Sequence, residues 1–155
     1  MLPKQHLAYG TLVALLLFFL VPQVGVLEAA VFLFFTFFID VDHYFVYVIR
    51  NGDLSLTKAL KYFDGMRKKY ALNKVSNIKT PTLIFHIWEF LILILVLSFF
   101  FPILIFGFFG LVFHVFLDFI DMRRMGVLTH RDYFYITRVI RRKFFARADK
   151  KYTYI

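Results

Sequence analysis

Residues 103–122 read ILIFGFFGLVFHVFLDFIDM, an apolar stretch whose only ionisable side chains are His114, Asp118 and Asp121. A helix needs about 20 mainly apolar residues to cross a hydrocarbon core, so this stretch predicts a membrane-spanning helix. The spacings i,i+4 and i,i+3 place the three polar side chains on one face of that helix. Because an ionisable side chain at the bilayer centre costs about 2.5–3.5 kcal/mol in insertion measurements, we expect this face to point into a helix bundle.

Three further apolar stretches, residues 7–26, 27–49 and 82–101, have lengths typical of membrane spans. Hydrophobic residues make up 61% of the 155 residues, whereas soluble domains contain about 45–50%. We therefore expect an all-α polytopic membrane protein, in which residues 1–155 form a single domain built on a four-transmembrane-helix bundle. The chain has no cysteine, which excludes disulfides, thiolate metal ligands and a cysteine nucleophile.

The basic residues indicate how the chain is oriented. Of 19 lysines and arginines, Lys4 precedes the first span, eight lie between Arg50 and Lys79, and ten lie between Arg123 and Lys151. The short connections between the paired spans contain none. By the positive-inside rule, both termini, the loop 50–81 and the tail 123–155 are expected on the cytoplasmic side of the cell membrane. This role accounts for the net charge of +9 without a nucleic-acid partner.

The loop and the tail are predicted to contain basic amphipathic helices on the inner leaflet, with membrane lipids as partners. In the loop, Asp53 or Ser55 is placed to cap a helix that carries Leu56, Leu60 and Phe63 on one side. His130 lies beyond the last span and is interpreted as an interfacial residue.

Ionisable side chains gather at one depth of the predicted bundle. Counted from the flanking basic residues at about 1.5 Å per residue, they fall between the cytoplasmic surface and mid-bilayer, with His6 at the surface. We take them as candidate metal ligands: His6, Asp40, Asp42, His43, His86, Glu89, His114 and Asp118. No lysine or arginine lies in the apolar stretches to neutralise these carboxylates, so they must be protonated or bind a metal. Mixed histidine and carboxylate ligands favour zinc or manganese, with iron a further option, over calcium.

The second span poses a geometric question. Asp40 and His43 share a helix face, whereas Asp42 points to a different side of a regular helix. Either Asp42 faces another neighbour or the helix unwinds near Asp40. We favour the break, because it would bring both carboxylates to one site.

The order of these elements, His6, Asp40-Val41-Asp42-His43, His86 and then His114 with Asp118, resembles the YdjM-like family of membrane-bound metal-dependent hydrolases. That family has an N-terminal histidine, a Pro-Asp-Ile-Asp-His run, a Thr-His-Ser segment and a His-x-x-x-Asp helix. The chain has Ile39 at the position of the proline and lacks the family's His-Arg-Gly run. The resemblance implies a membrane-embedded metal site and a hydrolase.

The residues themselves suggest similar chemistry. A histidine and carboxylate site with an open position lowers the pKa of bound water towards ~7 and needs no protein nucleophile. The expected substrate is an ester or phosphoester, such as a lipid headgroup at the cytoplasmic leaflet. Glu89 is the predicted general base or second-metal ligand, and Asp42 is a second candidate catalytic carboxylate. Two alternatives stay open: a metal-ion or proton transporter, and a non-catalytic protein with a structural metal.

Overall fold

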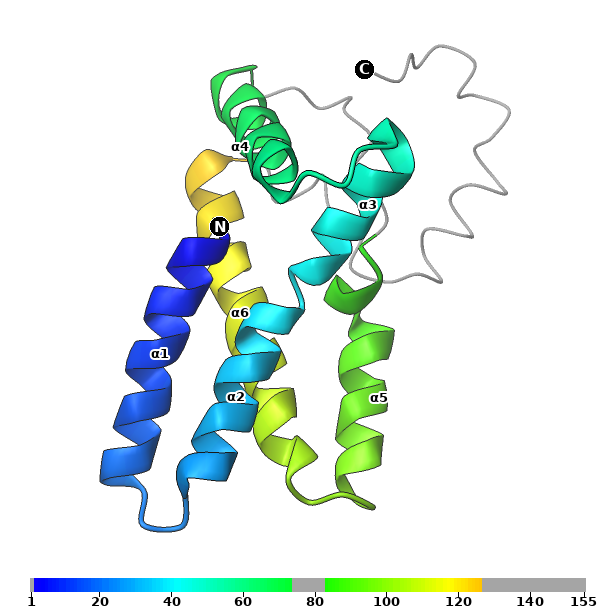
Figure 1. Cartoon of the computed structure of the whole chain (residues 1–155). Coiled ribbons are helices and arrows are strands. Elements are labelled where there is room, and N and C mark those ends of the chain that lie inside the picture. Colours follow the sequence, from blue (N-terminus) through cyan, green and yellow to red (C-terminus); the bar gives the residue numbers. More distant parts are fainter. Residues whose placement is uncertain (1, 74–82, 127–155) are drawn as a thin grey trace.

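The computed structural model describes residues 2–73 and 83–126 (Figure 1). These residues form helices and connections, with no strand among them. The elements in chain order are α1 (Pro3–Leu20), α2 (Val26–Phe38), α3 (Val41–Asn51), α4 (Leu56–Asn73), the 3₁₀ turn η1 (Ile84–His86), α5 (Trp88–Ser98) and α6 (Leu104–Met125). The predicted tail from residue 127 onwards, His130 included, and loop residues 74–82 lie outside the described ranges.

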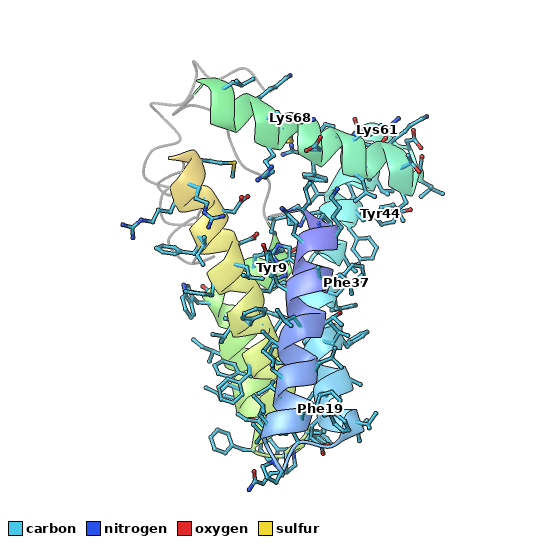
Figure 2. All side chains as sticks on the ribbon, turned by 90° about the vertical axis from the view of Figure 1, so that its left-hand side faces the viewer. Tyr9, Phe19, Phe37, Tyr44, Lys61 and Lys68 are labelled. Atoms are coloured by element: carbon cyan, nitrogen blue, oxygen red, sulfur yellow. The ribbon has the colours of Figure 1, made fainter. Side chains whose placement is uncertain are left out.

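Four helices, α1, α2, α5 and α6, lie side by side, and the short α1–α2 and α5–α6 connections lie together at one end (Figure 1). The N-terminus lies at the other end, where α4 crosses the bundle (Figure 2). Large apolar side chains face outward along the bundle, including Phe19 at 74% and Phe100 at 74% exposure. A surface of this kind suits contact with lipid rather than water.

Three helical segments are long and apolar enough to cross a membrane: Pro3–Leu20, Val26–Asn51 and Leu104–Met125. These correspond to the predicted spans 7–26, 27–49 and 103–122. The predicted span 82–101 is only partly helical, because it consists of η1, an extended residue at Ile87 and the 11-residue helix α5. The structure therefore shows an all-helical protein with three candidate spans, and α5 is too short to count as a fourth by length alone.

The predicted break in the second span is confirmed. Helix α2 ends at Phe38 and α3 begins at Val41, so Ile39 and Asp40 form a turn between them. The amide of Asp40 donates to the Phe37 carbonyl at 3.2 Å, which is a turn bond rather than a helical one. The turn separates the buried, apolar α2 from α3, whose first turn carries Asp42 and His43.

The loop helix is also confirmed, and it is longer than expected. Ser55 caps α4, since its hydroxyl accepts a hydrogen bond from the Lys58 amide at 3.3 Å, and Asp53 accepts one from the Ser55 amide at 2.8 Å. Helices α3 and α6 end at Gly52 and Gly126, whose φ angles of 63° and 71° are in the left-handed region that glycine adopts without strain.

Helices α2 and α6 approach so closely that a side chain at Gly110 is impossible without movement. A Cβ atom there would collide with the carbonyl oxygen of Phe32 and come within 3.2 Å of the Thr36 amide nitrogen. Thr36 is fully buried, and its hydroxyl donates to the Phe32 carbonyl at 2.9 Å. Small residues permit such backbone contact between membrane helices. This contact fixes the position of the next turn of α6, which carries His114.

Candidate metal centre

Seven of the predicted ligands converge where five segments of the chain meet. We call this group the His/Asp cluster: His6 on α1, Asp40 at the α2–α3 break, Asp42 and His43 on α3, His86 on η1, and His114 and Asp118 on α6. Most of it is buried, with His6 and His114 at 0% exposure and Asp42 at 5%. Residues up to 112 positions apart in sequence thus share one interior site.

The tautomer of His114 follows from a backbone contact. Its Nδ1 lies 2.7 Å from the carbonyl oxygen of Thr36, which can only accept a hydrogen bond. Nδ1 therefore carries the hydrogen, and Nε2 of the neutral ring presents a lone pair. A histidine fixed in this way by a backbone carbonyl is well prepared to ligate a metal.

His86 is fixed in the same way by a carboxylate. Its Nδ1 lies 3.0 Å from Asp42 Oδ2, and the same oxygen accepts the Phe85 amide at 3.1 Å. With its hydrogen on Nδ1, His86 also presents a lone pair at Nε2. These two bonds explain why the chain is not α-helical at His86, because the 3₁₀ turn brings both the amide and the ring to Asp42. Asp42 therefore orients a potential ligand.

The two prepared nitrogen atoms face each other. His86 Nε2 and His114 Nε2 are 3.2 Å apart, with the ring planes inclined at 71°. Two lone pairs at this distance repel unless a proton or a cation lies between them. Ligands held at about 2.0–2.2 Å around a tetrahedral ion are about 3.3–3.6 Å apart, so this separation fits two ligands of one ion.

Two carboxylate oxygens complete the set. Asp40 Oδ1 lies 3.8 Å from His86 Nε2 and 3.6 Å from His114 Nε2. Asp118 Oδ2 lies 3.8 Å and 3.7 Å from the same two atoms. We refer to Asp40, His86, His114 and Asp118 as the inner set. Its donor atoms suit zinc or manganese, and all of its measured separations are close to those expected around one ion.

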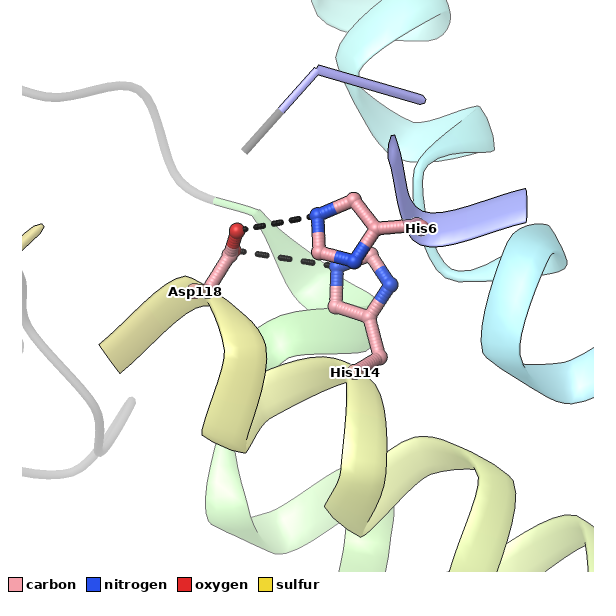
Figure 3. Close-up of side chains that lie close together, drawn as sticks. All are labelled: His6, His114 and Asp118. Carbon is pink, nitrogen blue, oxygen red and sulfur yellow. Dashed lines mark hydrogen bonds and ion pairs between the residues drawn. The ribbon is translucent and has the colours of Figure 1, made fainter. Parts of the chain in front are cut away.

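His6 contacts this set in a different manner (Figure 3). Its Nε2 lies 3.1 Å from Asp118 Oδ1, and its ring stacks on that of His114 with centroids 3.7 Å apart and planes within 12°. The potential ligand atoms of His6, His114 and Asp118 do lie within 4.8 Å of one another. However, the lone pairs of stacked imidazoles lie in parallel planes and cannot both point at one ion. The geometry therefore favours His6 as a residue that positions Asp118.

The other two predicted residues differ in their placement. His43 is part of the cluster, with Nδ1 3.5 Å from Asp40 Oδ1 and 3.0 Å from Asp42 Oδ1. Asp40, His43 and His86 form a second group whose potential ligand atoms lie within 4.8 Å of one another. Glu89 lies in the first turn of α5 and, among the described residues, belongs to neither such group.

Two features of the site escaped sequence analysis. The Thr36 carbonyl leaves no trace in the sequence, although Gly110, four residues before His114, signals a close helix approach. Arg67 of α4 pairs with Asp121 of α6 through its Nε at 3.0 Å and its Nη2 at 2.7 Å. This hydrogen bonding raises the pKa of Arg67 above its usual value. The pair ties α4 to the end of α6, one turn beyond Asp118.

Comparisons with models of protein families, with curated proteins and with solved structures found no match for this chain. The resemblance to the YdjM-like family therefore stays an expectation from the sequence, and any function must be argued from the geometry of the His/Asp cluster.

Proposed function

We propose that this chain is a multi-pass membrane hydrolase that uses a divalent ion, zinc or manganese, to cleave an ester or phosphoester. One observation carries the metal assignment: His86 Nε2 and His114 Nε2 face each other at 3.2 Å, and a hydrogen bond on each Nδ1 directs both lone pairs to the same place. Such preparation of two imidazoles by outer partners is typical of metal sites.

Each residue of the cluster then has a task. The inner set would hold the ion, Asp42 and the Thr36 carbonyl orient the two histidines, and His6 orients Asp118. When bound, the ion lowers the pKa of a nearby water and polarises a substrate oxygen.

In the reaction, the water oxygen forms a bond to phosphorus or the acyl carbon, the bond to the leaving oxygen breaks, and that oxygen gains a proton. Glu89 remains the proposed general base, since it follows His86 by three residues at the start of α5.

The surroundings of the cluster favour an amphipathic substrate. The cluster lies towards the bundle end crossed by α4, where the ring of Phe63 contacts that of His43 with centroids 5.0 Å apart. Below this end the helices expose apolar side chains. We place α4 at the cytoplasmic surface by the positive-inside rule, and we include α5 with its flanking residues as a fourth membrane segment. A lipid headgroup at that surface would then reach the cluster.

A structural metal is the second candidate function. Four protein ligands around one ion leave no open position, and closed sites of this kind are usually structural. The side chains of His86 and His114 are 1% and 0% exposed, which favours this alternative for an ion held by the inner set alone.

Metal analysis of the detergent-purified protein, grown with zinc and manganese, tests the proposal together with hydrolysis of a fluorescent phospholipid in mixed micelles. His114→Ala should lose most of the metal and all of the hydrolysis. Leu111→Ala is the matched control, because Leu111 is also fully buried on α6 but belongs to the apolar core. It should lower stability and keep the metal.

Wild-type protein without stoichiometric metal would refute the metal site and the hydrolase together. Metal that is lost with His114, but without turnover on phospholipid or on a soluble chromogenic ester or phosphoester, would favour the structural alternative.

A further inference from the structure

Three buried polar atoms at the α2–α3 break have no hydrogen-bond partner. They are Asp40 Oδ2, Asp42 Oδ1 and His43 Nδ1, all within four consecutive residues. Buried polar atoms nearly always find a partner, and each one left without costs about 1–3 kcal/mol. A concentration of such atoms in one short stretch indicates that something other than a protein hydrogen bond satisfies them.

The same three residues lie at ligand-like separations. His43 Nδ1 is 3.0 Å from Asp42 Oδ1 and 3.5 Å from Asp40 Oδ1, and yet it makes no hydrogen bond. The other oxygen of Asp42 is already used, because it accepts from His86 and the Phe85 amide. Asp42 Oδ1 is thereby held towards His43, on a side chain that is only 8% exposed.

Asp40 faces both ways. Its Oδ1 lies 3.6 Å from His114 Nε2 and belongs to the inner set, whereas Oδ2 is one of the unsatisfied atoms. A carboxylate with one oxygen directed to each of two positions is suited to bridging two ions. Paired ions in hydrolytic sites lie about 3.5–4 Å apart, which a bridging carboxylate can span.

We propose that the His/Asp cluster holds two divalent ions: one in the inner set and a second bound by Asp42 Oδ1, His43 Nδ1 and a bridging Asp40. This inference deepens the proposed hydrolase and rests on it for the first ion. The second position has three protein ligands and so keeps room for water and substrate, as catalytic sites do. It is also the more accessible position, because the His43 side chain is 27% exposed and that of His114 is 0% exposed.

Metal stoichiometry tests this directly, with manganese or zinc loaded into the purified full chain and excess removed. Wild type should retain about two ions per chain. His43→Ala and the milder His43→Gln should each retain about one. The matched control is Phe45→Ala, because Phe45 lies on α3 two residues further on with its side chain 53% exposed. It should retain both ions.

Electron paramagnetic resonance of the manganese-loaded protein gives an independent readout. Wild type should show the spectrum of two exchange-coupled ions, and His43→Gln that of an isolated ion. One ion per chain in wild type, unchanged in both His43 variants, would overturn the two-ion inference and leave the hydrolase standing. No ion in wild type would refute both proposals.

Discussion

His86 Nε2 and His114 Nε2 lie 3.2 Å apart although their residues are 28 positions apart, and each ring is held there by a bond at its opposite nitrogen. The outer partners, Asp42 and the Thr36 carbonyl, come from the two segments on either side of the α2–α3 break. Changes at this break or at the α2–α6 contact should therefore act on both histidines, even where they touch neither.

Gly110→Ala should separate α2 from α6. The added Cβ collides with the Phe32 carbonyl, and the movement needed to relieve this weakens the hydrogen bond from His114 to Thr36. We expect a loss of about 1–3 kcal/mol in the free energy of unfolding, together with weaker metal binding. Thermal unfolding in detergent and metal content measure the two effects. Gly65→Ala is the control, because a Cβ at Gly65 on α4 meets nothing within 4 Å. Equal behaviour of the two variants would contradict the close-contact explanation.

Asp42→Asn should weaken metal binding by about 10- to 100-fold, since it alters the group that orients His86. A competition titration with a chelator measures the affinity. Asp53→Asn provides the comparison, because Asp53 also precedes a helical turn but pairs with Lys58 outside the cluster. Unchanged affinity in Asp42→Asn would show that the contact with His86 does not govern metal binding.

Arg67→Gln should destabilise the protein by about 1–3 kcal/mol, because it leaves the buried carboxylate of Asp121 without its two charge-assisted bonds. In the double variant with Asp121→Asn, much of this loss should be recovered. Thermal unfolding of the single and double variants measures the coupling. The exposed Lys58–Asp53 pair serves as the reference and should contribute about 0–1 kcal/mol. Additive effects at Arg67 and Asp121 would argue against an energetic link between α4 and α6.

The absence of native cysteine allows a direct test of orientation. Leu60→Cys, at an exposed position on α4, should react with a membrane-impermeant reagent only after the membrane is opened. Val26→Cys, at the exposed start of α2 beside the α1–α2 turn, should react from outside intact cells. The reverse pattern would invert the proposed topology and move the cluster to the external leaflet.

The sequence contained enough to predict the helical class and the gathering of seven ligands. Charge depth placed the polar residues in one layer, and the angular offset of Asp42 from Asp40 and His43 indicated the break. The 3₁₀ turn at His86 could not be predicted, because residues 83–98 form an apolar run with no glycine or proline to interrupt a helix. That turn depends on Asp42, 43 residues earlier, accepting the Phe85 amide.

The separate roles of the histidines were also beyond the sequence. His6 and His86 have the same chemistry, and only the stacked or inclined geometry relative to His114 distinguishes them. The Thr36 contribution comes from a backbone carbonyl, which every residue type carries.

The break in the second span has an electrostatic consequence. Because α3 begins at Val41 and α5 begins at Trp88, two helices start next to the cluster. Each helix start carries a partial positive charge of about half an elementary charge. These two dipoles attract the anionic forms of Asp40 and Asp42, at a depth where the sequence supplies no lysine or arginine. The fold itself thus provides part of the countercharge, and the cluster can remain anionic and ready for a cation before any ion arrives.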